Sequence, residues 1–348
     1  MKVLFHIPSV ETVYAMRSIY HGFKNAFNYS GDVFKTLDQN VNFETILNEF
    51  KPDLFITSSH YWYRKQIDFK ILNIFRKKGM FVLVKVDFWN SPFSKFKINE
   101  AKALKDDYDL INLIKKDNFG DAYYHNVEQN DKRMDGFCEG TGRNFYTIPL
   151  ACDSFIFNDL RKNNKYASDI CFIGTNLNSK KIFFKKNLQK LRKNYNTKVI
   201  GQDWTTKDQM LGYLQKFGQY YNIKYLRTLR RPKLQLSEEG MYYFNSKICL
   251  NVHEDYQLNY GGDCNERTFK IPFCSGFQLV DRVNCIEKYF DNQELTFYDN
   301  DNDLFEKINF FLNQPDKRIK MIEKAQKKII QNHTYLNRVK FIKDVVMR

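Results

Sequence analysis

The chain has 348 residues, of which 43% are hydrophobic and 27% are charged. This length favours two domains over one, and the composition argues against long disorder. The longest apolar runs have only the length of strands, so we expect no membrane-spanning helix. The formal net charge of +15 indicates an anionic partner such as nucleic acid, a membrane surface or a phosphate-bearing substrate. An AT-rich genome would produce the same excess of Lys.

The first half of the chain alternates strand and helix patterns from its first residues, which predicts βαβ units and a parallel sheet. No basic stretch with a long apolar run precedes the first strand, Lys2–His6, so we expect no secretory signal and a cytoplasmic protein. Seven scattered Cys without a Cys-x-x-Cys pair favour buried thiols in a reducing compartment. Further strands are predicted at Asp53–Thr57, Phe81–Val86, Leu110–Asn112 and Phe145–Ile148, and helices at Thr12–Asn25, Asn42–Phe50 and Arg64–Lys78.

The alternation begins again after a linker at Pro149–Phe155, so the predicted fold class is α/β, with two Rossmann-like parallel-sheet domains facing a central cleft. The predicted domains are residues 1–152 and 153–330, and residues 331–348 form a C-terminal helix that packs back on the first domain. Strands are predicted at Asp169–Gly174, Lys198–Gly201, Lys247–Val252, Phe277–Asp281 and Leu295–Tyr298. Helices are predicted at Ser179–Lys193, Asp303–Leu312 with a capping box at Asp303 and Glu306, Pro315–Gln331 and Tyr335–Val346.

The turn that follows the strand Asp169–Gly174 has the features of a phosphate site. Gly174 and Thr175 lead into a helix whose first backbone N–H groups would point at an anion, and Lys180 and Lys181 add positive charge. The turn lacks the three spaced glycines of a dinucleotide fingerprint. An ordinary turn followed by a solvated Lys face would give the same pattern.

A polar loop follows the apolar strand Lys247–Val252. Acidic and amide side chains suit the hydroxyls of a sugar, Arg and backbone N–H groups suit a diphosphate, and adjacent glycines allow close approach. The candidate residues are His253, Glu254, Tyr260, Gly261, Gly262, Asn265, Glu266, Arg267 and Thr268. The alternative is a solvated loop in which Asn265 caps the next helix. A metal site is not favoured, because no second His lies at ligand spacing.

Aromatic and polar residues also follow two strands of the first half. His60 and Trp62 come after one strand, and Asp87 and Trp89 come after the next, so all four are expected at the carboxyl edge of the sheet. Such a group suits an acceptor sugar or a nucleic-acid base, with His60 and Asp87 as possible general bases. Packing between the domains is the alternative explanation.

Three segments resemble the bacterial spore-maturation (CgeB-like) glycosyltransferases, a branch of the GT-B superfamily: Cys249–His253, Asn265–Asp281 and Asn332–Arg338. Ile148–Asp153 and Asp169–Gly174 match that family's linker and its entry into the second domain. The resemblance implies that the second domain holds a nucleotide-sugar donor, UDP- or another NDP-sugar, and that the first holds the acceptor. It also implies chemistry in the cytoplasm without a metal or a further cofactor. We expect retention of the anomeric configuration, with inversion as the open alternative.

The resemblance also suggests roles for single residues. Lys180, Lys181 and Arg267, with the backbone of Gly174 and Thr175, would stabilise the leaving diphosphate. His253 and Glu254 would touch the sugar or the reacting centre. Where the family commonly has a Glu, which in related retaining enzymes holds the donor ribose, this chain has Lys270. Glu266 would then take over this contact, the donor would differ, or the protein would bind a donor without turning it over.

The sequence therefore favours a GT-B glycosyltransferase that moves a sugar to an acceptor hydroxyl on a protein, a glycan or a modified nucleic-acid base. Two alternatives remain open. One is a basic nucleic-acid-binding protein without catalysis, supported by the Lys-rich helix Lys180–Lys193 and the basic segment Arg227–Lys233. The other is a catalytically silent binder of a nucleotide-sugar, suggested by Lys270.

Overall fold

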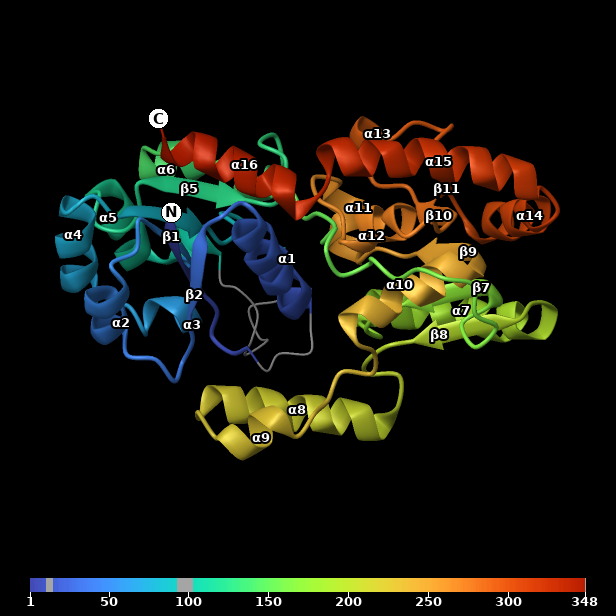
Figure 1. Ribbon diagram of the computed structural model, residues 1–348, viewed down its shortest axis with the longest axis horizontal. Helices are drawn as coiled ribbons and strands as arrows, with labels where there is room; N and C mark the ends of the chain where they lie inside the picture. Colours follow the sequence, from blue (N-terminus) through green and yellow to red (C-terminus); the bar gives the residue numbers. More distant parts are fainter. Residues whose placement is uncertain (11–14, 93–102, 348) are drawn as a thin grey trace. The chain divides into compact units, whose positions relative to one another are not determined.

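The computed structural model describes residues 1–10, 15–92 and 103–347 (Figure 1). Contacts group the described chain into two units, the first with residues 1–10, 23–149 and 338–347, and the second with residues 15–22 and 150–337. Each unit contains one parallel sheet, of six and five strands, so the predicted α/β fold class is confirmed. The central cleft and the predicted domain limits stay predictions.

The first unit is built on a sheet with the strand order β2-β1-β3-β4-β5-β6, in which every pair of neighbours is parallel. Its strands are β1 (Lys2–His6), β2 (Val33–Leu37), β3 (Leu54–Ser58), β4 (Phe81–Lys85), β5 (Ala122–His125) and β6 (Tyr146–Thr147). Its helices are the second half of α1 (Ala15–Tyr29), α2 (Phe43–Phe50), α3 (Tyr61–Arg64), α4 (Phe69–Lys77), α5 (Tyr108–Lys115), α6 (Phe137–Thr141) and most of α16 (Tyr335–Val346), with 3-10 turns at Leu104–Asp106 and Lys132–Met134.

Two predictions for this unit were wrong at the level of single elements. Leu110–Asn112 belongs to helix α5, because the Asp107 side chain accepts a hydrogen bond from the Leu110 N–H and so caps a helix whose Leu110, Ile111 and Ile114 are buried. The strand in this part of the chain is β5, which follows α5. Strand β2 was missed because it lies at the sheet edge and alternates between exposed and half-buried residues. The predicted helix Thr12–Asn25 begins within residues 11–14, which lie outside the described residues.

The second unit is built on a sheet with the order β11-β10-β9-β7-β8, again parallel throughout. Its strands are β7 (Ser168–Ile173), β8 (Thr197–Ile200), β9 (Ser246–Asn251), β10 (Gln278–Asp281) and β11 (Thr296–Tyr298). Its helices include α7 (Asn178–Asn194), α8 (Thr206–Tyr220), α9 (Lys224–Thr228), α10 (Leu236–Asn245), α11 (Asp255–Tyr260), α12 (Arg267–Phe273), α13 (Asn284–Tyr289), α14 (Asp301–Leu312) and α15 (Pro315–Asn332).

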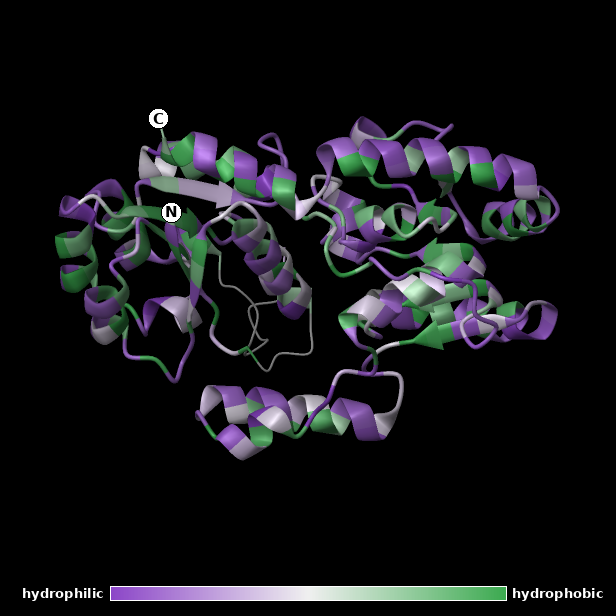
Figure 2. Cartoon of the chain, viewed as in Figure 1, coloured by the Kyte–Doolittle hydropathy of each residue, from purple (hydrophilic) through white to green (hydrophobic). Residues whose placement is uncertain are grey.

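Helices cover both faces of this second sheet. Alternate strand residues such as Cys171 and Cys249 pack with α10, α12 and α15 on one face, while Ile170 and Ile248 pack with α7 and α14 on the other. Figure 2 shows how α15 mixes hydrophobic and hydrophilic residues, as expected for a helix with one buried side. Six of the seven Cys are buried, as the sequence predicted, and only Cys138 is exposed.

Two smaller features complete the fold. The predicted capping box at Asp303 is wrong, because α14 begins earlier and the Asn300 side chain accepts hydrogen bonds from the N–H groups of Asn302 and Asp303. In the first unit, α16 is held by an ion pair of 2.6 Å between Lys343 and Asp32. Within the described parts of the chain, every helix is too short or too polar to span a bilayer.

Candidate functional site

In each sheet the second strand in the chain lies on one side of the first strand, and the later strands lie on its other side. This switch in direction occurs between β1 and β3 in the first unit and between β7 and β9 in the second. At such a switch point the connections leave in opposite directions, so the carboxyl ends of the two strands leave room for a ligand. In the second unit β7 ends at Ile173 and β9 ends at Asn251. The two sequence motifs predicted to bind the donor, at Gly174 and at His253–Arg267, therefore start at the same place.

Gly174 is fixed tightly at the end of β7. Its N–H donates to the carbonyl of Ile200 at 2.9 Å, and its carbonyl accepts from Trp204 Nε1 at 2.9 Å. A Cβ at this position would lie 2.9 Å from Nη1 of Arg267. The Gly174 N–H is thus used inside the sheet, and the residue instead provides the space in which the Arg267 guanidinium approaches the strand end.

Arg267 is the first residue of α12, and two of its nitrogens are anchored at the end of β9. Nε donates to Asn251 Oδ1 at 3.1 Å, and Nη2 donates to the carbonyl of Val252 at 2.9 Å. The guanidinium also lies 5.3 Å from the ring centre of Phe172. Nη1, which faces Gly174, has no acceptor within the described chain, so this nitrogen is positioned to donate to an anion.

Lys180, in the first turn of α7, forms a buried ion pair with Glu254. Burial and, to a lesser extent, the nearby charge of Arg267 lower the pKa of the Lys180 amine to about 8, although Glu254 opposes both effects. Lys180, Arg267 and Glu254 therefore form one cluster of charges at the switch point. The neighbouring Lys181 is exposed, so the structure separates the two lysines that the sequence grouped.

Several polar groups near this cluster have no partner within the described part of the chain. Asn265 is notable, because neither its side-chain oxygen nor its nitrogen has a partner although both are buried. The Thr175 N–H is also without an acceptor there, and no side chain caps the amino terminus of α7. Unsatisfied buried amides are costly, so a ligand that offers a donor and an acceptor to Asn265 would be favoured.

His253 is held in place by Asp281, at the end of β10. Asp281 accepts from the His253 backbone N–H at 2.7 Å, and its other oxygen lies 2.5 Å from Nδ1 of the imidazole. Nε2 lies 3.5 Å from the hydroxyl of Thr268, which in turn accepts from Asn251 Nδ2 at 3.1 Å. The sequence analysis missed Asp281 and Asn251, although an acid and an amide at strand carboxyl ends are a usable signal.

Glu266 and Lys270 belong to a buried charged group beside this cluster. Lys270 Nζ lies 3.2 Å from both Glu239 and Glu266, and Glu266 also accepts from the Tyr335 hydroxyl at 2.5 Å. Burial alone would lower the pKa of Lys270, but the two carboxylates outweigh it and hold this pKa above its ordinary value. Both oxygens of Glu266 therefore have protein partners, and the buried charge of Lys270 is compensated locally.

The remaining candidates of this loop form its frame. Gly261 has a φ of +72° and ends helix α11, a backbone conformation that favours glycine. Gly262 is buried, and Tyr260 is 42% exposed. The predicted open loop is thus partly helical, with α11 beginning after Glu254 and ending at Gly261.

In the first unit, Asp87 follows β4 and lies close to the end of β3. Its N–H donates to the Ser59 hydroxyl at 2.8 Å. Burial raises the pKa of the Asp87 carboxyl to about 6, although Ser59, Lys85 and Arg64 favour its charged form. Asp87 is therefore mostly ionised at neutral pH and chemically suited to accept a proton.

His60 and Trp89 contribute mainly to local structure. Nδ1 of His60 accepts from the Trp62 N–H at 3.4 Å, which places the proton of the neutral ring on Nε2. Burial and, to a lesser extent, the charges of Arg64 and Lys85 lower the pKa of His60 to about 4. Trp89 packs against α6, where a Cβ on Gly140 would lie 2.0 Å from its ring.

Comparison with known proteins places this geometry in context. Residues 180–344 match a family model described as glycosyl transferase-like. Among curated proteins, the spore protein CgeB of Bacillus subtilis (strain 168) is 23% identical over 208 residues. That alignment covers 56% of this chain and 58% of CgeB, so the chain spans a little over half of its relative.

Solved structures similar to the chain cover nearly all of it. An alpha-glucosyltransferase in complex with UDP and a 13-mer DNA containing a HMU base has a TM-score of 0.65 at 11% identity and covers 100% of both chains. The same kind of enzyme with UDP-glucose and DNA containing an abasic site has a TM-score of 0.64 at 12% identity and covers 99% of both chains. Sucrose-phosphate synthase from Thermosynechococcus elongatus has a TM-score of 0.62 at 9% identity and covers 99% of this chain and 98% of its own.

The resemblance to glycosyl transferase-like proteins such as CgeB is confirmed, and the family model matches residues 180–344. At these identities the solved structures establish the GT-B fold, with its two parallel-sheet α/β domains. Within the GT-B fold of this chain, the switch point of the second sheet brings together Gly174, Lys180, His253, Glu254 and Arg267.

Lys270 is expected to be a strong determinant of stability. Lys270→Met leaves Glu239 and Glu266 buried without their cation, and we expect it to lower the free energy of unfolding by about 3–5 kcal/mol in a urea titration. Lys307→Met is the matched control, since Lys307 pairs with the half-buried Asp303 over the same i,i+4 spacing and also donates to the Phe297 carbonyl, and its loss should cost only about 1 kcal/mol. Equal losses in the two variants would contradict the buried triad.

Asp281 is expected to set the tautomer of His253. In Asp281→Asn the amide oxygen still accepts from the His253 backbone N–H, but its NH2 group faces Nδ1, so the ring proton should move to Nε2. Nitrogen-15 NMR of the imidazole measures this change. Asp281→Ala removes both acceptors and should also cost about 1–3 kcal/mol of stability. An unchanged tautomer in Asp281→Asn would rule out the positioning role.

Proposed function

We propose that the protein is a metal-independent, retaining glycosyltransferase that uses a nucleotide-sugar, with UDP as the nucleotide we would test first. The observation that carries this proposal is Nη1 of Arg267, which lies beside Gly174 at the switch point of a GT-B donor-type sheet and has no acceptor among the described residues. A guanidinium anchored through two nitrogens offers its third nitrogen in a fixed direction, which suits a phosphate oxygen.

The diphosphate would be bound by three kinds of donor. Arg267 supplies a fixed fork, Lys180 supplies a second positive charge, and the Thr175 N–H and the uncapped first turn of α7 supply backbone donors. When the bond between the sugar carbon and the diphosphate oxygen breaks, negative charge develops on that oxygen. Lys180 and Arg267 would stabilise it, as a metal ion does in other enzymes. The retaining outcome rests on the family resemblance.

The sugar and the nucleoside would occupy the polar groups around this diphosphate. His253 and Glu254, at the end of β9, are the candidates for contact with the sugar. Asn265 has an unused donor and an unused acceptor, which suits a ligand with alternating hydrogen-bonding groups. In the first unit, Asp87 is the candidate that takes the proton of the acceptor hydroxyl. The acceptor itself, a protein, a glycan or a modified nucleic-acid base, stays open.

The replacement of the family's Glu by Lys270 bears on the alternative of a silent binder. Because Glu239 and Glu266 flank Lys270, the triad keeps a net negative charge at this position. Lys270 therefore does not convert an acidic site into a basic one. A nucleotide-sugar that requires a carboxylate at this position could still hydrogen-bond to Glu239. Release of free sugar from UDP-glucose in the absence of acceptor separates an active enzyme from a silent binder.

Arg267 gives the direct test of the donor site. UDP that binds only the native protein should stabilise it by about 2.7 kcal/mol at 100 times its Kd, which a thermal melt detects as a higher Tm. Arg267→Ala should weaken UDP binding by about 1.5–3 kcal/mol and remove most of that shift. Arg282→Ala is the matched control, because Arg282 also lies over a Phe ring, at 5.1 Å, but pairs with the exposed Glu287 and Asp299. The proposal fails if both variants keep the full shift.

Lys180 predicts how UDP binding depends on pH. Its pKa is lowered to about 8, so the amine loses its positive charge as the pH rises through that value, and the diphosphate loses one cation. UDP affinity should therefore fall above pH 8, by at most about tenfold per pH unit. In Lys180→Gln this dependence should vanish, whereas the exposed neighbour in Lys181→Gln should leave it intact. Calorimetric titration at several pH values measures both outcomes.

A further inference from the structure

The second unit carries a helical hairpin that buries small and polar residues on its inner side and exposes aromatic residues on its outer side. An ordinary amphipathic pair of helices has the opposite arrangement. The hairpin consists of α8 and α9 and connects β8 to α10. Figure 1 draws it below and to the left of the five-stranded sheet of its own unit. The inner side of α8 consists of small and polar residues, Asp208, Gly212, Gln215 and Gly218, all of which are buried. The hydrophobic side chains of α8 and α9, all of which are described, are at most half-buried.

Close backbone approach and buried charges hold the hairpin together instead. A Cβ on Gly218 would lie 2.6 Å from Leu226, so only glycine lets the two helices approach this closely. Arg230 is 2% exposed and pairs with Asp203 at 2.6 Å and with Asp208 at 3.4 Å. These contacts lie on the inner side of the hairpin and leave its outer side exposed.

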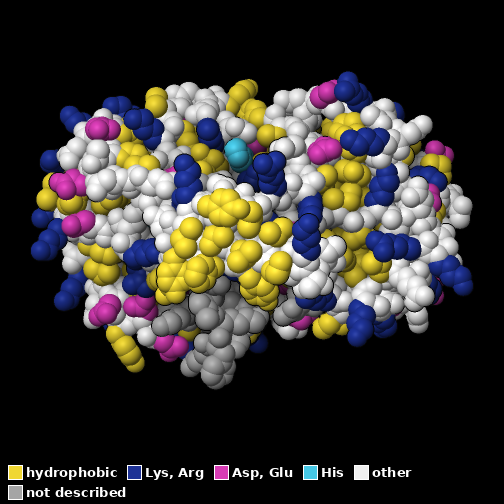
Figure 3. Space-filling view, turned by 90° about the horizontal axis from the view of Figure 1, so that it is seen from below, with side chains coloured by type: hydrophobic (Ala, Val, Ile, Leu, Met, Phe, Trp, Pro, Cys, Tyr) yellow, Lys and Arg dark blue, Asp and Glu magenta, His cyan; other side chains and the backbone are white. Residues whose placement is uncertain are grey.

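The outer side of the hairpin carries aromatic residues at helical spacing. Tyr213 is 73% exposed, Phe217 is 50% exposed and Tyr221 is 58% exposed, and the rings of Phe217 and Tyr221 lie 4.5 Å apart. Met210, Tyr220, Ile223 and Tyr225 are exposed beside them. In Figure 3, which looks at the molecule from the side of the hairpin, hydrophobic side chains gather in one area with Lys and Arg around it. An exposed patch of this kind marks a binding surface.

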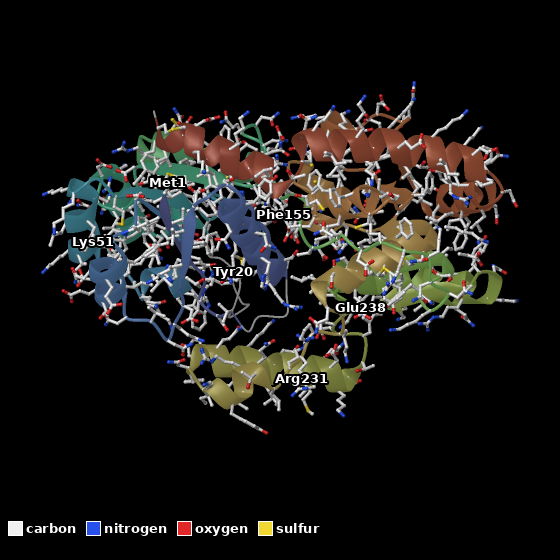
Figure 4. The ribbon with its side chains drawn as sticks, viewed as in Figure 1. Met1, Tyr20, Lys51, Phe155, Arg231 and Glu238 are labelled. Carbon is white, nitrogen blue, oxygen red and sulfur yellow. The ribbon has the colours of Figure 1, made fainter. Side chains whose placement is uncertain are left out.

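The charges of the hairpin select the kind of partner. Residues 203–233, all of them described, contain seven Lys and Arg and only two acids, and Arg230 pairs with both of these acids. The exposed cations are Lys207, Lys216, Lys224, Arg231 and Lys233, and Figure 4 labels Arg231 where the chain leaves α9. A surface with exposed cations and aromatic rings, and without an exposed carboxylate, fits a polyanion that presents flat bases.

We propose that this hairpin surface, defined as the exposed side chains of α8, α9 and residues 231–233, binds a single strand of nucleic acid. Unpaired bases would stack on Tyr213, Phe217 and Tyr221, and phosphates would lie against the Lys side chains. A duplex offers no free base faces, and an interfacial membrane helix needs a broader aliphatic face than four Tyr, one Phe, one Met and one Ile provide. The inference goes beyond the proposed function and does not require that the strand be the acceptor.

The test uses the full chain and a fluorescein-labelled oligo(dT) strand of about 20 nucleotides, with oligo(rU) and a duplex of the same length as further arms. Fluorescence anisotropy should show binding of the single strands and weaker binding of the duplex. Tyr213→Ala, Phe217→Ala and Tyr221→Ala combined should weaken oligo(dT) binding at least about tenfold. Tyr29→Ala with Tyr108→Ala removes two equally exposed rings of the first unit, and it should bind as the unchanged protein does.

The charge arm measures the salt dependence of the same binding. Lys216→Gln should reduce the slope of log affinity against log salt by about 0.7, the value for one lost contact with a single strand. Lys320→Gln, which removes an exposed Lys from α15, should leave the slope unchanged. Thermal melts should be the same for all these variants, because every substituted side chain is exposed.

Four outcomes would overturn the inference. Two concern oligonucleotides: oligo(dT) binding that survives the triple aromatic substitution, and equal affinity for the duplex and the single strand. The other two indicate a different partner: binding to anionic phosphatidylglycerol vesicles but not to oligonucleotides, and a change from dimer to monomer on aromatic substitution without a change in oligonucleotide binding. UDP melts of the same proteins separate this inference from the proposed function. A UDP shift without oligo(dT) binding removes only the hairpin inference, and oligo(dT) binding without a UDP shift removes only the donor site.

Discussion

The second unit depends on the close approach of the Arg267 guanidinium to Gly174. Three constraints converge there: the glycine leaves the space, Asn251 and Val252 hold two guanidinium nitrogens, and the sheet order places β7 beside β9. A larger residue at position 174 would push the guanidinium away from the strand end. The same contact sets the electrostatics of the site, because the Arg267 charge helps to lower the pKa of Lys180.

Buried charges in this unit are compensated in small groups. Lys180 pairs with Glu254, Lys270 with Glu239 and Glu266, and Arg230 with Asp203 and Asp208. A buried charge is tolerated only when partners and hydrogen bonds offset the loss of water. Each group therefore fixes the relative positions of the elements it joins. Arg267 differs from these cations because its two hydrogen-bond acceptors, a backbone carbonyl and an amide oxygen, are neutral.

Sequence patterns predicted the fold class, and they predicted that the turn at Gly174 and the loop after β9 begin at the same edge of the sheet, because strand–turn–helix alternation fixes where carboxyl ends meet. They failed where the local pattern has two solutions. Leu110–Asn112 has the apolar content of a strand, and only the cap by Asp107 shows that it is helical. Lys180 and Lys181 look equivalent in the sequence, yet consecutive residues of a helix point in different directions. Lys180 is buried in the charged cluster, and Lys181 is exposed to solvent. Glu239 could not be assigned to Lys270, since nothing local connects residues so far apart.

The net charge of +15 is informative only once burial is known. In the basic segment Arg227–Lys233, Arg227 and Arg230 are buried and stabilise the hairpin, whereas Arg231 and Lys233 are exposed. Counting Lys and Arg along the sequence therefore overstates the charge available there to a partner. What distinguishes the hairpin is instead the absence of exposed carboxylates across residues 203–233 together with aromatic rings in water. An AT-rich codon bias accounts for Lys and Tyr in number, but it gives no reason for the small and polar residues of α8 to be buried while its aromatic residues are exposed.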